Sequence, residues 1–147
     1  MYRTIIKPFC IIFSFSCLFL SCESDKERLE HTLLDRKVWV VDSIKIDSSI
    51  VFSFGRKYTD NWNFNENIIR FHKTGIINLP PMDNNLLNKA HWELIDSNNK
   101  VELSIEKSDI KNFNQVYFID LKQDKGLYHL KLISDKCSIF ARAPYVH

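Results

Sequence analysis

Side chains capable of acid–base, nucleophilic or metal chemistry are scattered along this chain rather than grouped. His72, His91 and His129 fall on the polar faces of expected strands, where imidazoles on neighbouring strands would have to converge to bind zinc. No His-x-His or Cys-x-x-Cys pair accompanies them, so solvent-facing histidines are the favoured interpretation. Glu93 and Glu102 would face each other across a hairpin, on a polar face where carboxylates are ordinarily solvated.

The sequence contains no motif for nucleophilic or phosphate chemistry. There is no Gly-x-Ser-x-Gly elbow, and the three glycines, Gly55, Gly75 and Gly126, are too widely spaced for a phosphate-binding loop. We therefore expect that the protein is not an enzyme and that it has no catalytic residue, no metal site and no cofactor.

Of the four cysteines, Cys22 is the one that follows a recognisable sequence motif. Arg3 and Lys7 precede an apolar run over residues 8–20. That run is shorter than the about 20 residues of a membrane span and is typical of a signal peptide. It ends in Phe19-Leu20-Ser21-Cys22, which resembles the lipobox of bacterial lipoproteins: two apolar residues, a small one, and the cysteine that takes the lipid.

This resemblance implies that residues 1–21 are a lipoprotein signal peptide and that Cys22 is the lipidation site. A retained transmembrane anchor is the alternative. The protein would be held in the cell envelope by its N-terminal lipid, with the outer membrane as the expected membrane. Cys137 would then be the single cysteine of the folded body, without a disulfide partner, and we expect a small buried apolar side chain rather than a nucleophile.

The charge balance argues against a nucleic-acid partner. Removal of residues 1–21 takes away Arg3 and Lys7 and no acidic residue, which leaves 18 basic and 18 acidic side chains. A chain without basic excess lacks the charge that neutralises phosphates, so we expect no nucleic-acid binding.

The mature chain divides into a lipidated tether, residues 22–32, and one domain, residues 33–147. Ser24 and Glu27 have capping-box spacing, and Leu29 and Leu33 are four residues apart, which predicts a short helix at this junction.

Beyond the helix the hydrophobic pattern changes to a period of two, which is typical of strands. About eight strands, most of them spaced near ten residues apart, predict an all-β fold, either an antiparallel barrel or a sandwich. We expect them within 38–46, 50–54, 64–73 (continued briefly by 76–77 after a turn or bulge), 91–95, 101–105, 116–122, 127–133 and 137–141.

Three stretches resemble small lipocalin-like lipoproteins of the Bacteroidota type. Residues 33–44 resemble the family's opening, a Leu-rich turn and a tryptophan strand, with Lys37 where glycine often stands. Residues 69–75 followed by His91-Trp92-Glu93-Leu94 resemble its central hairpin, and residues 117–121 and 127–132 resemble its closing strands. The resemblance implies an up-and-down barrel and carries over no catalytic residue and no ligand.

Aromatic residues supply the candidate ligand contacts. Phe52, Phe54 and Trp62 belong to an aromatic-rich segment between early strands that would act as a lid over a barrel mouth. Ordinary core packing is the alternative for Phe52 and Phe54. Trp92 is expected mainly as interior packing, with ligand stacking as the alternative.

Three functions are compatible with these observations. The leading hypothesis is a lipid-anchored barrel that binds a small apolar ligand or an envelope protein partner. The second is a barrel without a cavity that serves as an interaction subunit of an envelope complex. The third, an enzyme, would require a buried polar cluster with perturbed pKa values.

Overall fold

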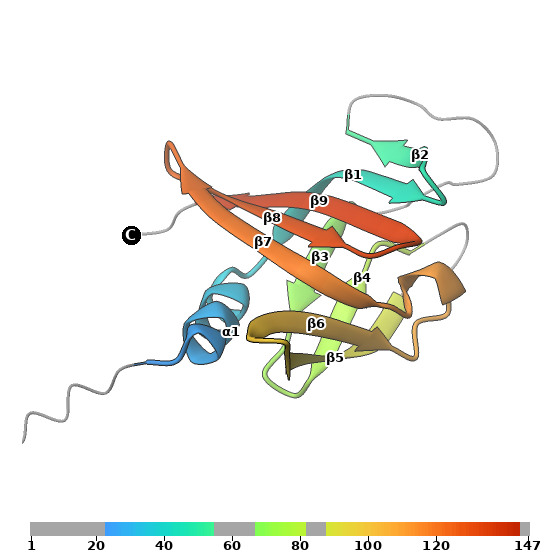
Figure 1. Cartoon of the computed structure of the whole chain (residues 1–147). Coiled ribbons are helices and arrows are strands. Elements are labelled where there is room, and N and C mark those ends of the chain that lie inside the picture. Colours follow the sequence, from blue (N-terminus) through green and yellow to red (C-terminus); the bar gives the residue numbers. More distant parts are fainter. Residues whose placement is uncertain (1–22, 55–66, 82–87, 145–147) are drawn as a thin grey trace, which may run out of the picture.

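The computed structural model describes residues 23–54, 67–81 and 88–144 and shows an all-β barrel with one short helix at its end (Figure 1). The predicted signal peptide and Cys22 lie outside the described residues. The elements are α1 (Asp25–Asp35), β1 (Trp39–Ile46), β2 (Ser49–Ser53), β3 (Ile68–Phe71), β4 (Ile76–Leu79), β5 (Asn88–Ser97), β6 (Lys100–Glu106), the 3-10 helix η1 (Lys111–Phe113), β7 (Val116–Asp124), β8 (Leu127–Ile133) and β9 (Cys137–Pro144).

Strand β1 closes the barrel. The antiparallel order runs from β3 through β9, and β1 pairs with β3 on one edge and with β9 on the other. The result is a closed eight-stranded barrel, from which β2 branches as a hairpin partner of β1. Closure gives the barrel strands partners on both sides, so the expected up-and-down barrel is confirmed.

A β-bulge in β1 sets which side chains face the interior. Val41 pairs with Ala141 and Ser43 with Phe140, which leaves Asp42 as the extra residue. Trp39 and Val41 are buried before the bulge, and Ile44 and Ile46 after it. An unbroken period of two could bury one of these pairs but not both. The first residues of β1 are apolar on both faces, and the bulge explains how the strand still buries an apolar side chain at each end.

Three hairpins are joined by loops of two residues, both with positive φ: β1–β2, β5–β6 and β7–β8. This is the backbone that type I′ turns require, and it matches the twist of the flanking strands. Asn98 and Asn99 have φ values of 48° and 62°, and Lys125 and Gly126 have 47° and 80°. Both turns join pairs of strands that the sequence predicted. Strands β5, β6 and β7 are longer than predicted, and β8 has the predicted bounds.

Large side chains fill the interior from both ends. Leu33 enters from α1 at the end where β1 begins, and Phe113 enters from η1 at the opposite end; both are fully buried. Trp39 and Tyr117 are also fully buried. Each aromatic donor is satisfied, because Trp39 Nε1 donates to the Leu33 carbonyl and the Tyr117 hydroxyl to the Phe113 carbonyl.

Helix α1 begins with the predicted capping box. The Glu27 amide donates to Ser24 Oγ at 3.2 Å, and the Ser24 amide donates to the Glu27 carboxylate at 2.9 Å. The second hydrogen bond lowers the pKa of Glu27, because the charged form accepts it. Most of the predicted tether is therefore helical. In the described part of the chain, no helix has the length and apolar character of a membrane span.

Cys137 is buried, as expected, and its environment predicts a loss of stability at alkaline pH. Desolvation raises the pKa of Cys137 from 9.0 to about 11, and burial also raises the pKa of Tyr117. The folded chain therefore keeps protons that the unfolded chain releases. The thiol's contribution is fully present below about pH 9 and is lost as the pH rises towards 11.

Urea unfolding should show this loss directly. The free energy of unfolding should fall between about pH 8 and about pH 10, and Cys137→Ala should lose about 1 kcal/mol less than the parent chain. An equal loss in both proteins would contradict the assigned role of the thiol.

Candidate functional site

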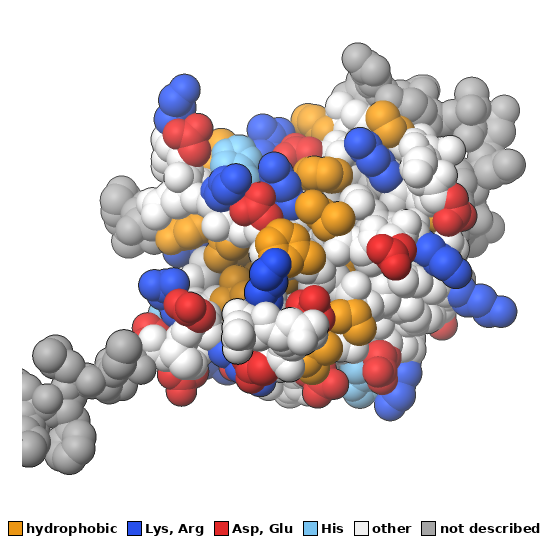
Figure 2. All heavy atoms as spheres, viewed as in Figure 1, with side chains coloured by type: hydrophobic (Ala, Val, Ile, Leu, Met, Phe, Trp, Pro, Cys, Tyr) orange, Lys and Arg blue, Asp and Glu red, His pale blue; other side chains and the backbone are white. Residues whose placement is uncertain are grey.

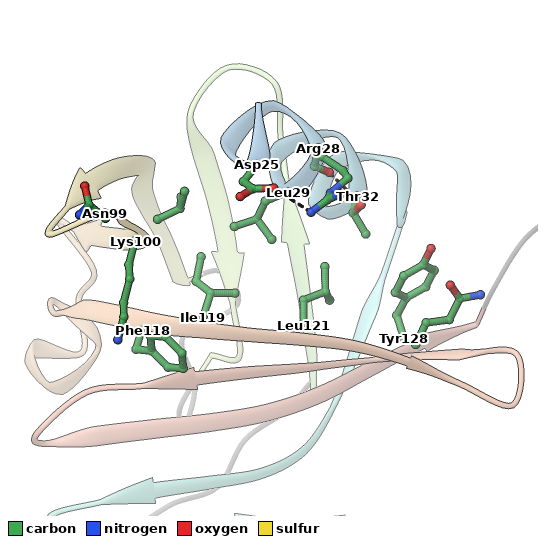
Figure 3. A pocket seen from close by; sticks show the side chains of 12 residues that line it. Asp25, Arg28, Leu29, Thr32, Asn99, Lys100, Phe118, Ile119, Leu121 and Tyr128 are labelled. Carbon is green, nitrogen blue, oxygen red and sulfur yellow. Dashed lines mark hydrogen bonds and ion pairs between the residues drawn. The ribbon is translucent and has the colours of Figure 1, made fainter. Parts of the chain in front are cut away.

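An open cleft of about 610 Å³ separates α1 from the rim of the barrel (Figure 3). We call it the α1 cleft. Its volume is within the range of small-molecule sites, about 300–1,000 Å³. It is lined by Asp25, Arg28, Leu29, Thr32, Asn99, Lys100, Val101, Phe118, Ile119, Leu121, Gln123 and Tyr128.

One face of α1 forms the roof of the cleft. Asp25, Arg28, Leu29 and Thr32 line it, with separations of three and four residues that place them on the same side of a helix. Leu29 is half-buried and points towards the barrel (Figure 3). The next apolar position, Leu33, is fully buried in the barrel end.

The β7–β8 hairpin forms the floor. Ile119, Leu121 and Gln123 alternate with outward residues and therefore share one face of β7. Tyr128 of β8 is the register partner of Gln123 and completes this surface. The floor is therefore apolar over the first two positions and polar at the far end.

Helix α1 is fixed to the barrel near both of its ends. At the C-terminal end, the buried Leu33 and the hydrogen bond from Trp39 fix the helix. Near the N-terminal end, Lys26 Nζ lies 3.5 Å from the Asp96 carboxylate. The Lys26 side chain is 39% exposed and the Asp96 side chain 72%, so solvent screens this ion pair and it contributes little stability.

The charges around the cleft are unequally paired. Arg28 and Asp25 form an ion pair at 2.8 Å across one helical turn. Lys100 Nζ lies 5.6 Å from the centre of the Phe118 ring, and within the described ranges it has no carboxylate at ion-pair distance. The lining therefore carries two cations and one carboxylate.

The residues predicted to bind ligand do not line this cleft. Phe54 is 56% exposed at the end of β2, and the Arg142 guanidinium lies 5.7 Å from its ring, so core packing is wrong for this residue. Phe52 is half-buried and packs against the core. Trp62 and the lipidation site Cys22 lie outside the described residues.

Trp92 occupies the barrel core. It is 7% exposed, and its Nε1 donates to the His72 carbonyl at 3.1 Å. Its ring meets the Phe71 ring edge-on, with 5.1 Å between centroids. These contacts match the interior packing that was expected for Trp92.

The histidines and carboxylates considered for metal binding or acid–base chemistry do not come together in the structure. His72 and His91 are exposed, His129 is half-buried, and the described residues contain no group of three or more ligands able to hold a metal ion. Glu93 pairs with Ser104, and Glu102 with Ile95, so the two carboxylates are not directly opposed. The sequence contained one signal for the α1 cleft, the predicted helix with Leu29 beside Leu33, but nothing that placed this helix over β7.

The fold and the cleft define a class of protein: a closed eight-stranded antiparallel barrel with a helix over one end and an open cleft between them. No family model, curated protein or solved structure matches this chain. The lipocalin-like resemblance therefore stays a prediction that rests on the sequence motifs.

The roof of the cleft should depend on the capping box. Ser24→Ala removes one hydrogen bond at the start of α1 and should cost the helix about 1 kcal/mol. Hydrogen exchange of the first-turn amides should then accelerate about fivefold, while the β7 amides stay unchanged. Ser49→Ala, an exposed serine of β2, is the matched control and should not alter exchange in α1.

Proposed function

We propose that this protein is a lipid-anchored lipoprotein of the cell envelope that binds a small apolar ligand in the α1 cleft. The observation that carries the proposal is the cleft itself, with Leu29 above Ile119 and Leu121 and an opening to solvent. The barrel interior is a poorer candidate, because Trp39, Tyr117 and the other large core residues occupy it.

The N-terminal signal supports the anchored part of this proposal. The apolar run, the lipobox-like residues 19–22 and the neutral mature domain together fit a lipoprotein of the outer membrane. Helix α1 begins at Asp25, three residues after Cys22. An anchored protein would therefore present the α1 end of the barrel, and with it the cleft, close to the lipid surface.

Anchoring is tested by metabolic labelling. Cys22→Ala should abolish incorporation of radioactive palmitate, because no other cysteine follows two apolar residues and a small one. Cys17→Ala is the matched control within the same leader and should still be labelled. Persistent labelling of Cys22→Ala would overturn the lipobox assignment.

Ligand binding is tested with a small uncharged aryl diazirine applied to the full chain in isolated membranes. Carbene insertion should map to α1 and β7 peptides. Leu29→Gln should reduce this labelling about fivefold to tenfold, because burial of a leucine contributes on the order of 1–2 kcal/mol. Leu34→Gln changes a half-buried leucine of the same helix that does not line the cleft, and it should label like the parent chain.

A second candidate is the interaction subunit without a ligand. Val116, Phe118 and Ile133 are large exposed apolar side chains on β7 and β8, and Phe118 is the register partner of Ile133. Figure 2 shows apolar side chains in a row over this face, interspersed with charged ones. Exposed apolar patches of this kind favour a protein partner. Absence of cleft labelling by the diazirine would favour this function.

A further inference from the structure

The outer surface of β7, β8 and β9, which we call the β7–β9 face, gathers exposed apolar side chains. Val116 and Phe118 share the outer side of β7, because they are two residues apart, and Phe118 is the register partner of Ile133 on β8. The half-buried Phe140 of β9 is the partner of Lys131, two residues before Ile133, and so lies on the same side. Apolar and charged side chains alternate over this surface (Figure 2).

Two lysines lie against the aromatic rings of the β7–β9 face. Lys100 Nζ lies 5.6 Å from the centre of the Phe118 ring, and Lys45 Nζ lies 5.7 Å from the centre of the Phe140 ring. Lys100 begins β6 and Lys45 belongs to β1, so the two cations border the face from opposite sides. Figure 3 shows Phe118 and the end of the Lys100 side chain on the side of β7 away from the cleft.

The positive charge of these two lysines is not neutralised locally. Within residues 23–54, 67–81 and 88–144, neither Lys45 nor Lys100 has a carboxylate at ion-pair distance. Asp120, on the outer side of β7, is shared by Lys122 at 3.4 Å and Lys131 at 3.7 Å. The middle of the face therefore offers apolar side chains and lysine ammoniums to whatever covers it.

This composition favours a lipid surface over a protein partner. Lysine is depleted in the buried centres of protein interfaces, because its ammonium is costly to desolvate. At a membrane surface, the lysine stem stays on apolar groups while the ammonium remains among water and headgroup phosphates. Lys45 and Lys100 have this arrangement, with each ammonium beside an aromatic ring.

The N-terminal end of the described chain lies beside the same face. Ser24 and Lys100 line one hollow at the β5–β6 turn, and Lys26 Nζ lies 3.5 Å from the Asp96 carboxylate. Cys22 is two residues before Ser24, a reach of at most about 7 Å. A lipid on Cys22 would therefore hold the Phe118 side of the face near the membrane. Such a short tether gives an effective concentration on the order of millimolar, so a weak contact suffices.

We propose that the β7–β9 face lies on the headgroup region of the membrane that holds the lipid anchor. Phe118 and Ile133 enter the interface, and Lys45 and Lys100 donate hydrogen bonds to headgroup phosphates. This inference rests on the proposed lipid anchor and adds a second membrane contact, which fixes the orientation of the barrel. It does not depend on a ligand in the α1 cleft.

The test uses the full chain, processed and lipidated in cells, in vesicles of equal parts phosphatidylcholine and phosphatidylglycerol. A nitrobenzoxadiazole fluorophore is attached to Ile133→Cys or, as the matched control, to His91→Cys, an exposed position on β5 across the barrel. Cys137 is buried, which disfavours its labelling. Nitroxide-labelled acyl chains should quench the fluorophore at position 133 and leave the one at position 91 unquenched.

Lysine variants test the contact with headgroups. Lys45→Gln combined with Lys100→Gln should weaken the docked state about fivefold for each lysine, the contribution of a lysine near an anionic lipid surface. Lys73→Gln combined with Lys89→Gln removes two exposed lysines outside the face and should leave quenching at position 133 unchanged. Equal quenching in both double variants would overturn the role of Lys45 and Lys100.

The remaining outcomes separate this inference from the proposed function. Flotation with the vesicles reports the anchor, whereas quenching reports the face. A protein that floats but shows no difference between positions 133 and 91 would keep its anchor and overturn this inference. A protein that does not float would overturn the anchored function itself. Absence of quenching in vesicles, together with shielding of position 133 from solvent in isolated membranes, would assign the face to a protein partner instead.

Discussion

The pairing of β1 with β9 is the constraint on which the rest of the structure depends. Without it, the strands would form an open sheet with β9 at one edge and the β1–β2 hairpin at the other. Closure directs one face of each barrel strand inwards, and the enclosed space has to be filled by side chains. Trp39 and Tyr117 provide this filling from the barrel strands β1 and β7, and Phe113 provides it from η1. Stability and closure are thus coupled through the same residues.

The position of α1 follows from the barrel, and the cleft follows from the position of α1. A helix joined to β1 by three residues has to lie at the end where β1 begins. Leu33 is drawn into the barrel end, and its carbonyl accepts the Trp39 indole hydrogen bond. The preceding turn of the helix then extends over the projecting β7–β8 hairpin, where contact is loose. The barrel interior is therefore tightly packed, whereas the space between α1 and the β7–β8 hairpin is only partly filled by side chains. Helix α1 borders the cleft on one side and the hairpin on the other.

This arrangement shifts the functional interpretation away from the barrel interior. The sequence directed attention to aromatic side chains as a lid, and in the structure Trp92 packs inside while Phe54 is exposed next to Arg142. The residues that line the cleft are individually unremarkable: a leucine, an isoleucine, a tyrosine and a lysine on four different elements. Only their juxtaposition gives them a common chemistry, an apolar floor on β7 beneath the half-buried Leu29 of α1.

The sequence by itself determined the local structure. The capping box of α1, the period of two in the strands and the left-handed turn residues at Asn98, Asn99 and Gly126 are all interactions between near neighbours in the chain, so they could be predicted. The tertiary structure decided the bulge at Asp42, because the shift in register matters only when β1 is paired with β9. It also decided the α1 cleft, because Leu29 and Leu121 are distant in sequence and meet only after the barrel has closed. Local preferences specify elements, whereas a site between elements depends on long-range packing, which no pattern within a single segment encodes.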